Sequence, residues 1–163
     1  MGHRARRTAA LTVVCALAWL GCAGPAVRGL PAQPPRALDL AGRAQALALA
    51  PGERALVLHF WATWCPACVE ELGALERAAP ACREHGVRVV ALNVGESAEE
   101  VARYAASHAL ALDVLLDARG EIWRASGARS LPANWLWTPA GASTSSGAST
   151  QSEWSARLRE LGC

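Results

Sequence analysis

The chain has 163 residues, which is enough for one domain with a proper hydrophobic core and too few for a second independent domain. It contains no lysine, and three of its sixteen arginines (Arg4, Arg6 and Arg7) precede an apolar run near the N-terminus. The other thirteen arginines are balanced by fourteen acidic residues, so the positive net charge comes from the first residues. No nucleic-acid partner is indicated.

Residues 1–22 are typical of a signal peptide. An apolar run from Thr8 to Cys22 follows the arginines and ends in small residues. The run is shorter than the about 20 apolar residues that span a bilayer, so a retained anchor is the less favoured alternative. Cys22 lies in the sequence Leu-Gly-Cys-Ala, which resembles a bacterial lipobox and predicts a lipid on Cys22. Ordinary cleavage just downstream is the alternative.

Either kind of processing predicts a mature protein outside the cytoplasm, on the periplasmic side, where disulfides persist. Cys15 is lost with the leader, and Cys22 is lipidated or lost. Four cysteines then remain: Cys65, Cys68, Cys82 and Cys163. Residues 23–36 contain four prolines and little hydrophobic periodicity, which predicts an extended tether ahead of a domain at 37–163.

The first half of the predicted domain contains two strands around a helix. Residues 55–62 form an apolar run of strand length, which predicts a strand buried on both faces. After Pro66, apolar residues recur at spacings of three and four and predict a helix, which Pro80 should kink. Its inner face would be Leu72, Leu75, Ala79 and Cys82. Residues 87–94 are a second predicted strand.

A capping box then begins the next predicted helix, at Ser97 and Glu100. The predicted inner face of this helix is Val101, Tyr104, Ala105 and His108. Glu96, Glu99 and Glu100 are interpreted as the solvated start of the helix. Residues 114–116 are a short predicted strand, and 117–120 have the composition of a turn.

The last predicted elements are a strand, a turn and a helix. Residues 133–138 follow Pro132 and place Trp135 and Trp137 on one face of a strand. The Ser/Thr-rich residues after Gly141 lack apolar alternation and predict at best an irregular strand. A final helix is expected, with these markers: caps Thr150 and Glu153, inner residues Trp154, Leu158 and Leu161, and a stop at Gly162. This order of elements predicts a three-layer α/β fold with a mixed sheet.

Cys65 and Cys68 lie where the strand at 55–62 runs directly into the helix. Free backbone N–H groups and the helix dipole stabilise an anion at this helix N-terminus, which should lower the pKa of the Cys65 thiol. Pro66 at the first helical position loses no useful N–H. Cys68 is one turn further on, placed to attack a mixed disulfide at Cys65. The spacing predicts Cys65 as the attacking thiol and Cys68 as the resolving one.

A zinc site is an alternative interpretation of the same cysteines, because Cys82 and His85 supply a second pair of ligands. Thirteen intervening helical residues extend about 20 Å, whereas zinc ligands must all lie within about 2.3 Å of the metal. The spacing therefore disfavours zinc, and we predict neither a metal nor a cofactor.

Several motifs resemble the TlpA/ResA-like branch of the thioredoxin superfamily, whose members are membrane-tethered thiol-disulfide oxidoreductases. The resemblance covers the chain from about Arg36 onward. It is carried by the sequences Phe-Trp-Ala-Thr-Trp-Cys-Pro-Ala-Cys at 60–68, Glu-Glu-Leu at 70–72, Asn-Val-Gly-Glu-Ser at 93–97, and Leu-Pro at 131–132 followed by a strand and Pro-Ala-Gly at 139–141. It implies a thioredoxin fold, an α/β/α sandwich around a central mixed sheet.

The resemblance also implies roles for individual residues. The Leu131–Pro132 bond would be cis and would face the cysteine pair, where its backbone holds an extended substrate peptide. Glu71 matches an acidic residue thought to tune the acidity of the thiols; a solvated residue in the first helical turn is the alternative. Trp64, beside Cys65, would form part of the docking surface.

The sequence departs from this family pattern at three places. Pro66-Ala67 stands between the cysteines, where many relatives have proline second. His59 stands where thioredoxins have a buried Asp and close relatives often Asn; it could relay a proton to Cys68, although a satisfied core histidine is the favoured interpretation. Ala133-Asn134 replaces the usual Thr-Thr after the cis-proline.

The remaining tryptophans and cysteines have structural interpretations. Trp61, Trp135 and Trp137 are expected in the core. Cys82 lies on the inner face of its helix, and a disulfide between Cys82 and Cys163 is a hypothesis, alongside a free buried Cys82.

The leading functional prediction is an extracytoplasmic enzyme that reduces protein disulfides through Cys65 and Cys68. The family implies electrons from a membrane thiol donor and, for some members, apocytochrome c as substrate. A disulfide-forming oxidant is one alternative. A Cu(I) chaperone is another, but the only methionine is Met1, in the leader. A thiol peroxidase is disfavoured because Thr63 is only two residues before Cys65, so the redox pair has no Thr-x-x-Cys motif. We expect a monomer.

Overall fold

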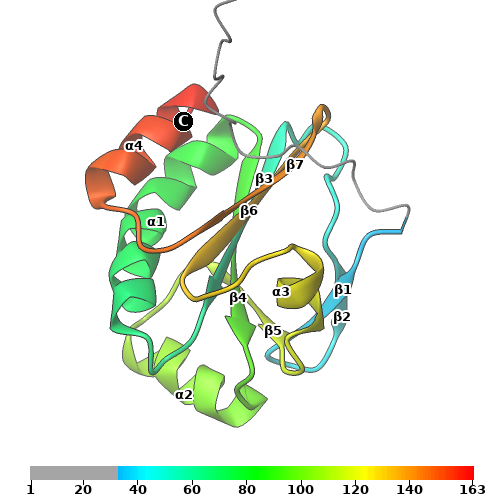
Figure 1. Cartoon of the computed structure of the whole chain (residues 1–163), viewed down its shortest axis with the longest axis vertical. Helices are drawn as coiled ribbons and strands as arrows, with labels where there is room; N and C mark the ends of the chain where they lie inside the picture. Colours follow the sequence, from blue (N-terminus) through cyan, green and yellow to red (C-terminus); the bar gives the residue numbers. More distant parts are fainter. Residues whose placement is uncertain (1–32) are drawn as a thin grey trace, which may run out of the picture.

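A computed structural model describes residues 33–163. Its centre is a seven-stranded mixed sheet with the order β2-β1-β5-β4-β3-β6-β7, shown edge-on in part by Figure 1. The strands are β1 (Arg36–Asp39), β2 (Ala44–Ala46), β3 (Ala55–Trp61), β4 (Val87–Val94), β5 (Asp113–Asp117), β6 (Ala133–Thr138) and β7 (Gly141–Ser146). Strands β3, β4 and β5 run parallel to one another. Each strand added on either side is antiparallel to the strand that it pairs with.

Four helices cover the sheet: α1 (Pro66–Glu84), α2 (Ala98–Ser107), α3 (Glu121–Ala125) and α4 (Gln151–Glu160). Helices α1 and α4 lie side by side on one face, and the short helix α3 lies on the other (Figure 1). This arrangement confirms the predicted α/β/α thioredoxin fold with a mixed sheet.

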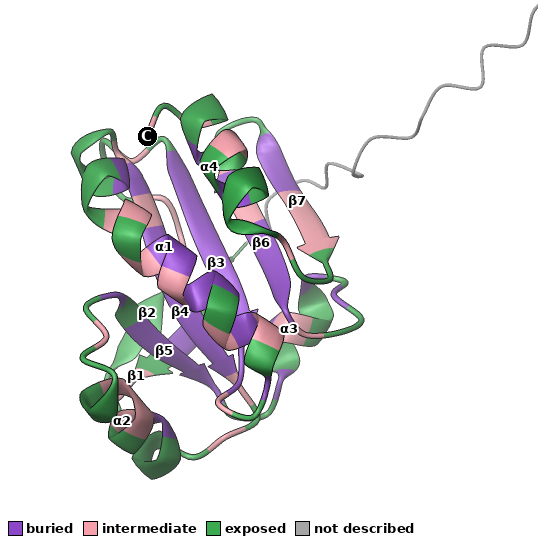
Figure 2. Ribbon diagram, turned by 90° about the vertical axis from the view of Figure 1, so that its left-hand side faces the viewer, coloured by how far each residue is buried: buried purple, intermediate pink, exposed green. Residues whose placement is uncertain are grey.

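Strand β3 divides the core between the two faces of the sheet. Every residue of β3 is buried, as the continuous purple strand in Figure 2 shows. Because side chains alternate along a strand, Val57 and Trp61 join the cluster under α1 and α4, whereas Leu58 and Phe60 join the cluster on the α3 side. His59, between Leu58 and Phe60, therefore faces α1.

Most elements begin and end where the sequence predicted them. Strand β4 matches its predicted range, and Pro80 lies inside α1. Both predicted capping boxes are present, Ser97 with Glu100 and Thr150 with Glu153. These signals depend on residues close together in the sequence, so the elements form where the sequence predicts them regardless of distant partners.

Three elements were missed, and two segments were predicted wrongly. Strands β1 and β2 and helix α3 were not predicted. His108 does not face the core: it is exposed at the C-cap of α2, where its ring stacks on Tyr104. The Ser/Thr-rich segment is a regular six-residue strand, because β7 pairs with β6 along its whole length and buries Ala142.

The predicted signal peptide (1–22) lies outside the described residues, as does the lipidation site Cys22. Most of the predicted tether does too, although its last residue, Arg36, already belongs to β1. Within residues 33–163, no helix is both long and apolar enough to cross a membrane.

Candidate redox site

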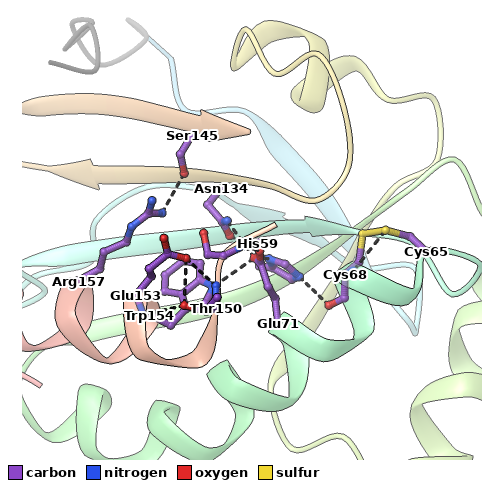
Figure 3. Close-up of polar contacts among 11 residues, drawn as sticks. His59, Cys65, Cys68, Glu71, Asn134, Ser145, Thr150, Glu153, Trp154 and Arg157 are labelled. Carbon is purple, nitrogen blue, oxygen red and sulfur yellow. Dashed lines mark hydrogen bonds and ion pairs between the residues drawn. A yellow bond between two sulfur atoms is a disulfide. The ribbon is translucent and has the colours of Figure 1, made fainter. Parts of the chain in front are cut away.

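Cys65 and Cys68 lie at the N-terminus of α1, as predicted. Cys65 is the N-cap, Pro66 is in the first turn, and Cys65 Sγ accepts a hydrogen bond from the Cys68 backbone N–H at 3.3 Å. The two cysteines form a disulfide with Sγ atoms 2.07 Å apart (Figure 3). Cys65 retains 7 % exposure and Cys68 none. The exposed member is therefore the one that an incoming disulfide can reach, and the helix N-terminus stabilises its thiolate.

The loop before Cys65 is held by one carboxylate from the end of β4. Glu96 accepts hydrogen bonds from the backbone N–H of Thr63 at 2.7 Å, from the Thr63 hydroxyl, and from Asn93 Nδ2 at 2.6 Å. Glu96 is half-buried, so its interpretation as a solvated residue at a helix start was wrong. Its contacts fix the loop that presents Trp64 beside Cys65.

Trp64 is the most exposed large apolar side chain among the described residues, at 68 %. The three tryptophans expected in the core, Trp61, Trp135 and Trp137, are all buried, and the last two pack edge to face. An exposed indole next to a reactive cysteine is suited to contact a polypeptide substrate.

Glu71 lies about 0.8 of a helical turn beyond Cys68 and is only 1 % exposed, so the solvated alternative was wrong. Its Oε2 accepts from Asn134 Nδ2 at 3.2 Å and from Trp154 Nε1 at 3.1 Å, and its Oε1 accepts from the backbone N–H of Ser149 (Figure 3). A buried carboxylate is tolerated only when it is paired and hydrogen-bonded, and these donors meet that requirement.

His59 is fully buried between this carboxylate and the redox pair. Its Nδ1 lies 2.8 Å from Asn134 Oδ1 and 3.5 Å from Glu71 Oε2, and its Nε2 lies 3.2 Å from the Cys68 carbonyl oxygen. Burial lowers the pKa of His59, while the contacts with Asn134, Glu71 and Cys68 act to raise it. Both ring nitrogens have partners, which confirms a satisfied core histidine and also connects it to Cys68.

The Leu131–Pro132 bond is cis, as the resemblance implied. Leu131 packs against the core cluster that contains Cys65 and Cys68. The carbonyl of Pro132 accepts from the Gly147 N–H at 2.9 Å, which fixes the segment to the end of β7. Its role in holding a substrate peptide stays a prediction.

Cys82 forms a second disulfide with Cys163, in agreement with the hypothesis drawn from the sequence. The bond joins the buried face of α1 to the residues after α4. Cys82 is thus bonded to sulfur and is not available to the alternative zinc site with His85.

Sequence reasoning missed three residues that complete the site. Asn134 was noted only as a departure from the family pattern, Trp154 only as a core residue, and Glu96 only as a solvated one. The signal that was present is their chemistry: an amide in a buried strand and an indole on an inner helix face both require hydrogen-bond partners.

Residues 30–142 match the profile of the AhpC/TSA family. The chain belongs to this family. It is similar to the thiol-disulfide oxidoreductase ResA of Geobacillus thermodenitrificans, with 32 % identity over 60 % of this chain and 56 % of ResA. The chain thus spans about half the length of the curated relatives it matches. The resemblance to ResA-like proteins is confirmed.

Solved structures of the family's fold agree with this assignment. A secreted Mycobacterium tuberculosis disulfide oxidoreductase homologous to E. coli DsbE superposes with a TM-score of 0.65 at 26 % identity, over 77 % of this chain and 94 % of that one. StoA from Bacillus subtilis superposes with a TM-score of 0.63 at 23 % identity, over 82 % of this chain and all of StoA, which shows the shared fold.

Proposed function

We propose that this protein is an extracytoplasmic thiol-disulfide oxidoreductase that reduces disulfides in other proteins. The observation that carries the proposal is the Cys65–Cys68 pair at the N-terminus of α1, with the accessible sulfur at the N-cap and an exposed Trp64 beside it. Relatives named thiol-disulfide oxidoreductases support it.

The exchange begins with the Cys65 thiolate, which attacks a substrate disulfide and forms a mixed disulfide, and one substrate sulfur leaves as a thiolate. Cys68 then loses its proton, attacks Cys65 Sγ and closes the Cys65–Cys68 disulfide, which releases the second substrate thiolate. The two substrate thiolates take up protons. Two electrons pass from the protein dithiol to the substrate, and a membrane thiol donor must return two electrons for the next cycle.

Substrate peptides would lie across Trp64, Pro66 and the Leu131–Pro132 segment. Trp64 and Pro66 are exposed at the mouth of the site, and Leu131 packs against the cluster beneath it. Apocytochrome c, whose haem-binding cysteines must be reduced, is the substrate that the resemblance favours. A monomer suffices for this chemistry, since one chain supplies both cysteines.

The proposed location follows from the N-terminal sequence. A signal peptide over residues 1–22, a lipid on Cys22 and a tether to residue 36 would hold the domain at the outer surface of the membrane. The similar Mycobacterium tuberculosis protein is described as secreted. A radiolabelled fatty acid that is incorporated by the full chain and not by a Cys22→Ala variant would test this.

The reduction potential of the Cys65–Cys68 pair tests the direction of the reaction. Titration of the domain against glutathione and dithiothreitol buffers, with tryptophan fluorescence as the readout, should give a value near that of thioredoxin, about −270 mV, or below. A value near about −120 mV, as in DsbA, would make the protein an oxidant. Absence of a two-electron transition would refute dithiol exchange.

A trapping experiment tests the assignment of roles within the pair. A Cys68→Ser variant should accumulate a mixed disulfide with a peptide substrate, because its attacking thiol remains and its resolving thiol is gone. The matched Cys65→Ser variant should form none. A trapped complex through Cys68 would reverse the two roles.

A further inference from the structure

Two of the departures from the family pattern are in direct contact. His59 of β3 and Asn134 of β6 are opposite each other in the antiparallel pair, and their side chains are hydrogen-bonded at 2.8 Å. With Glu71 from α1 they form a buried unit, here called the polar triad (Figure 3). All three side chains are at most 5 % exposed.

The hydrogen bonds of the polar triad determine where its protons lie. Asn134 donates through Nδ2 to the Glu71 carboxylate, so its Oδ1 can only accept, and the Nδ1 of His59 must donate to it. The Nε2 of His59 faces the Cys68 carbonyl, which is also only an acceptor. In this arrangement both ring nitrogens carry hydrogens, and His59 is an imidazolium opposite the carboxylate of Glu71.

Turning the Asn134 amide around would exchange its donor and its acceptor. His59 would then keep a hydrogen only on Nε2, and Glu71 would need a proton to donate to Asn134 Oδ1. This second arrangement holds the same number of protons as the first. Removing one proton from either arrangement leaves two acceptors facing each other, so the polar triad resists losing its last shared proton.

Burial acts in the opposite direction on His59. It lowers the pKa of the imidazole, because a charged ring is poorly solvated at this depth. The hydrogen bonds of the polar triad thus favour keeping the proton, whereas burial favours losing it from His59.

We propose that His59 is a positioning residue that promotes ionisation of Cys68, by holding a proton within the polar triad while it donates Nε2–H to the Cys68 carbonyl. A positive ring in contact with this residue stabilises a thiolate on the same residue. The inference rests on the proposed function for its role, since Cys68 must lose its proton before it attacks the mixed disulfide.

Few other charges bear on His59. Helix α1 contributes Glu71 and the Cys68 thiol, and β6 contributes Asn134, which does not titrate. The residue opposite His59 on β4 is Ala91. Helix α4 contributes Arg157, whose guanidinium lies 5.6 Å from the ring centre of Trp154, the residue whose indole donates to Glu71.

A cavity gives the triad access to solvent on the side away from the cysteines. It has a volume of about 230 Å³ and lies between β6, β7 and α4. Asn134, Trp154 and Arg157 are among its lining residues. Water in this cavity would reach Asn134 without passing the redox pair, so the triad can exchange protons while a substrate covers Cys65.

The test measures ionisation of Cys68 in isolation. In a Cys65→Ser background with the Cys82–Cys163 disulfide intact, Cys68 is the only free thiol of the domain 33–163, and its thiolate is detected by ultraviolet absorbance across pH. Adding His59→Asn, the side chain often found in relatives, should raise the pH midpoint by about 1 unit, since an opposite charge nearby shifts such midpoints by about 1 to 3 units. His108→Asn, at an exposed histidine, is the control and should leave it unchanged.

A second measurement does not depend on the stability of the His59 variant. By reciprocity, reducing the disulfide in the unaltered domain should raise the midpoint at which His59 itself titrates, followed through its ring ¹⁵N chemical shifts. Equal Cys68 midpoints with and without His59, or no change in the His59 titration on reduction, would overturn the proposal. Neither readout uses a substrate, so the proposal can fail while the reduction potential still supports a reductase.

Discussion

Removing the Cys82–Cys163 disulfide should cost the domain more stability than removing the redox disulfide. The two bonds differ in the length of chain that they close: Cys82 and Cys163 are 81 positions apart, whereas Cys65 and Cys68 are three apart. A cross-link restricts the unfolded chain, and the restriction grows with the logarithm of the loop length.

The chain-entropy model gives about 4.5 kcal/mol for the long loop and about 2 kcal/mol for the short one at 25 °C. We therefore expect a Cys82→Ala/Cys163→Ala variant to lose about 4.5 kcal/mol of unfolding free energy, and Cys65→Ala/Cys68→Ala to lose about 2 kcal/mol. For a domain of this size, the difference corresponds to a separation in Tm of roughly 8 to 10 °C.

Denaturant titration of the oxidised domain, followed by circular dichroism, measures both values under the same conditions. The comparison is matched, because each variant loses one disulfide and two sulfur atoms. If the Cys82/Cys163 variant were no less stable than the Cys65/Cys68 variant, loop closure would not be the source of stability and the reasoning would fail. Alkylation of Cys163 in the native oxidised protein would refute the bond itself.

Three further results are expected. Glu96→Ala should cost about 2 kcal/mol in denaturant unfolding, because hydrogen bonds to a charged group contribute about 1.5 to 3 kcal/mol and Thr63 loses its acceptor. Hydrogen bonds from Thr150 lower the pKa of Glu153. This capping box therefore stabilises α4 fully at pH values above the ordinary carboxyl pKa, and the stabilisation is lost as the pH falls through the lowered pKa. Thr150→Ala should raise the titration midpoint of Glu153, measured by NMR. Trp64→Ala should change stability by less than about 0.5 kcal/mol and still weaken peptide binding measured by calorimetry, because the indole is mostly exposed.

The sequence was sufficient for those parts of the fold that are determined locally. The strand before Cys65, the helix after it and both capping boxes depend on residues within a few positions of one another. The redox pair could also be predicted, since a three-residue spacing at a strand-to-helix junction already defines its chemistry. Helical periodicity also placed Cys82 on the buried face that meets Cys163.

The elements that were missed depend on partners far away in the chain. Strand β7 contains almost no apolar residues, yet it is regular because β6 supplies a complete ladder of hydrogen bonds. Strand β1 was not predicted, and only its first residue, Arg36, lay in the predicted tether. It forms by pairing with β5, where Leu38 lies opposite Leu116 and Asp39 opposite Leu115. Strand propensity depends on such neighbours more than on composition, so these segments could not be recognised by their own residues.

Glu71 shows the same limit at the site. Its position in the first turns of a helix allowed either a solvated or a functional residue, and only its partners decide between them. Those partners are His59 on β3, Asn134 on β6, the Ser149 backbone and Trp154 on α4. No spacing rule connects them, because four separate elements must pack before the carboxylate is enclosed.

The two departures at His59 and Asn134 are better understood as a single change in physical terms. A buried histidine without partners costs several kcal/mol, so His59 requires a group opposite it that accepts from Nδ1. Asn134 lies 75 positions away and is the residue that the β3–β6 register places there. The same amide donates to Glu71. Either residue alone would leave an unsatisfied buried polar group, whereas together they connect the carboxylate to Cys68, which is why the departures are informative as a pair.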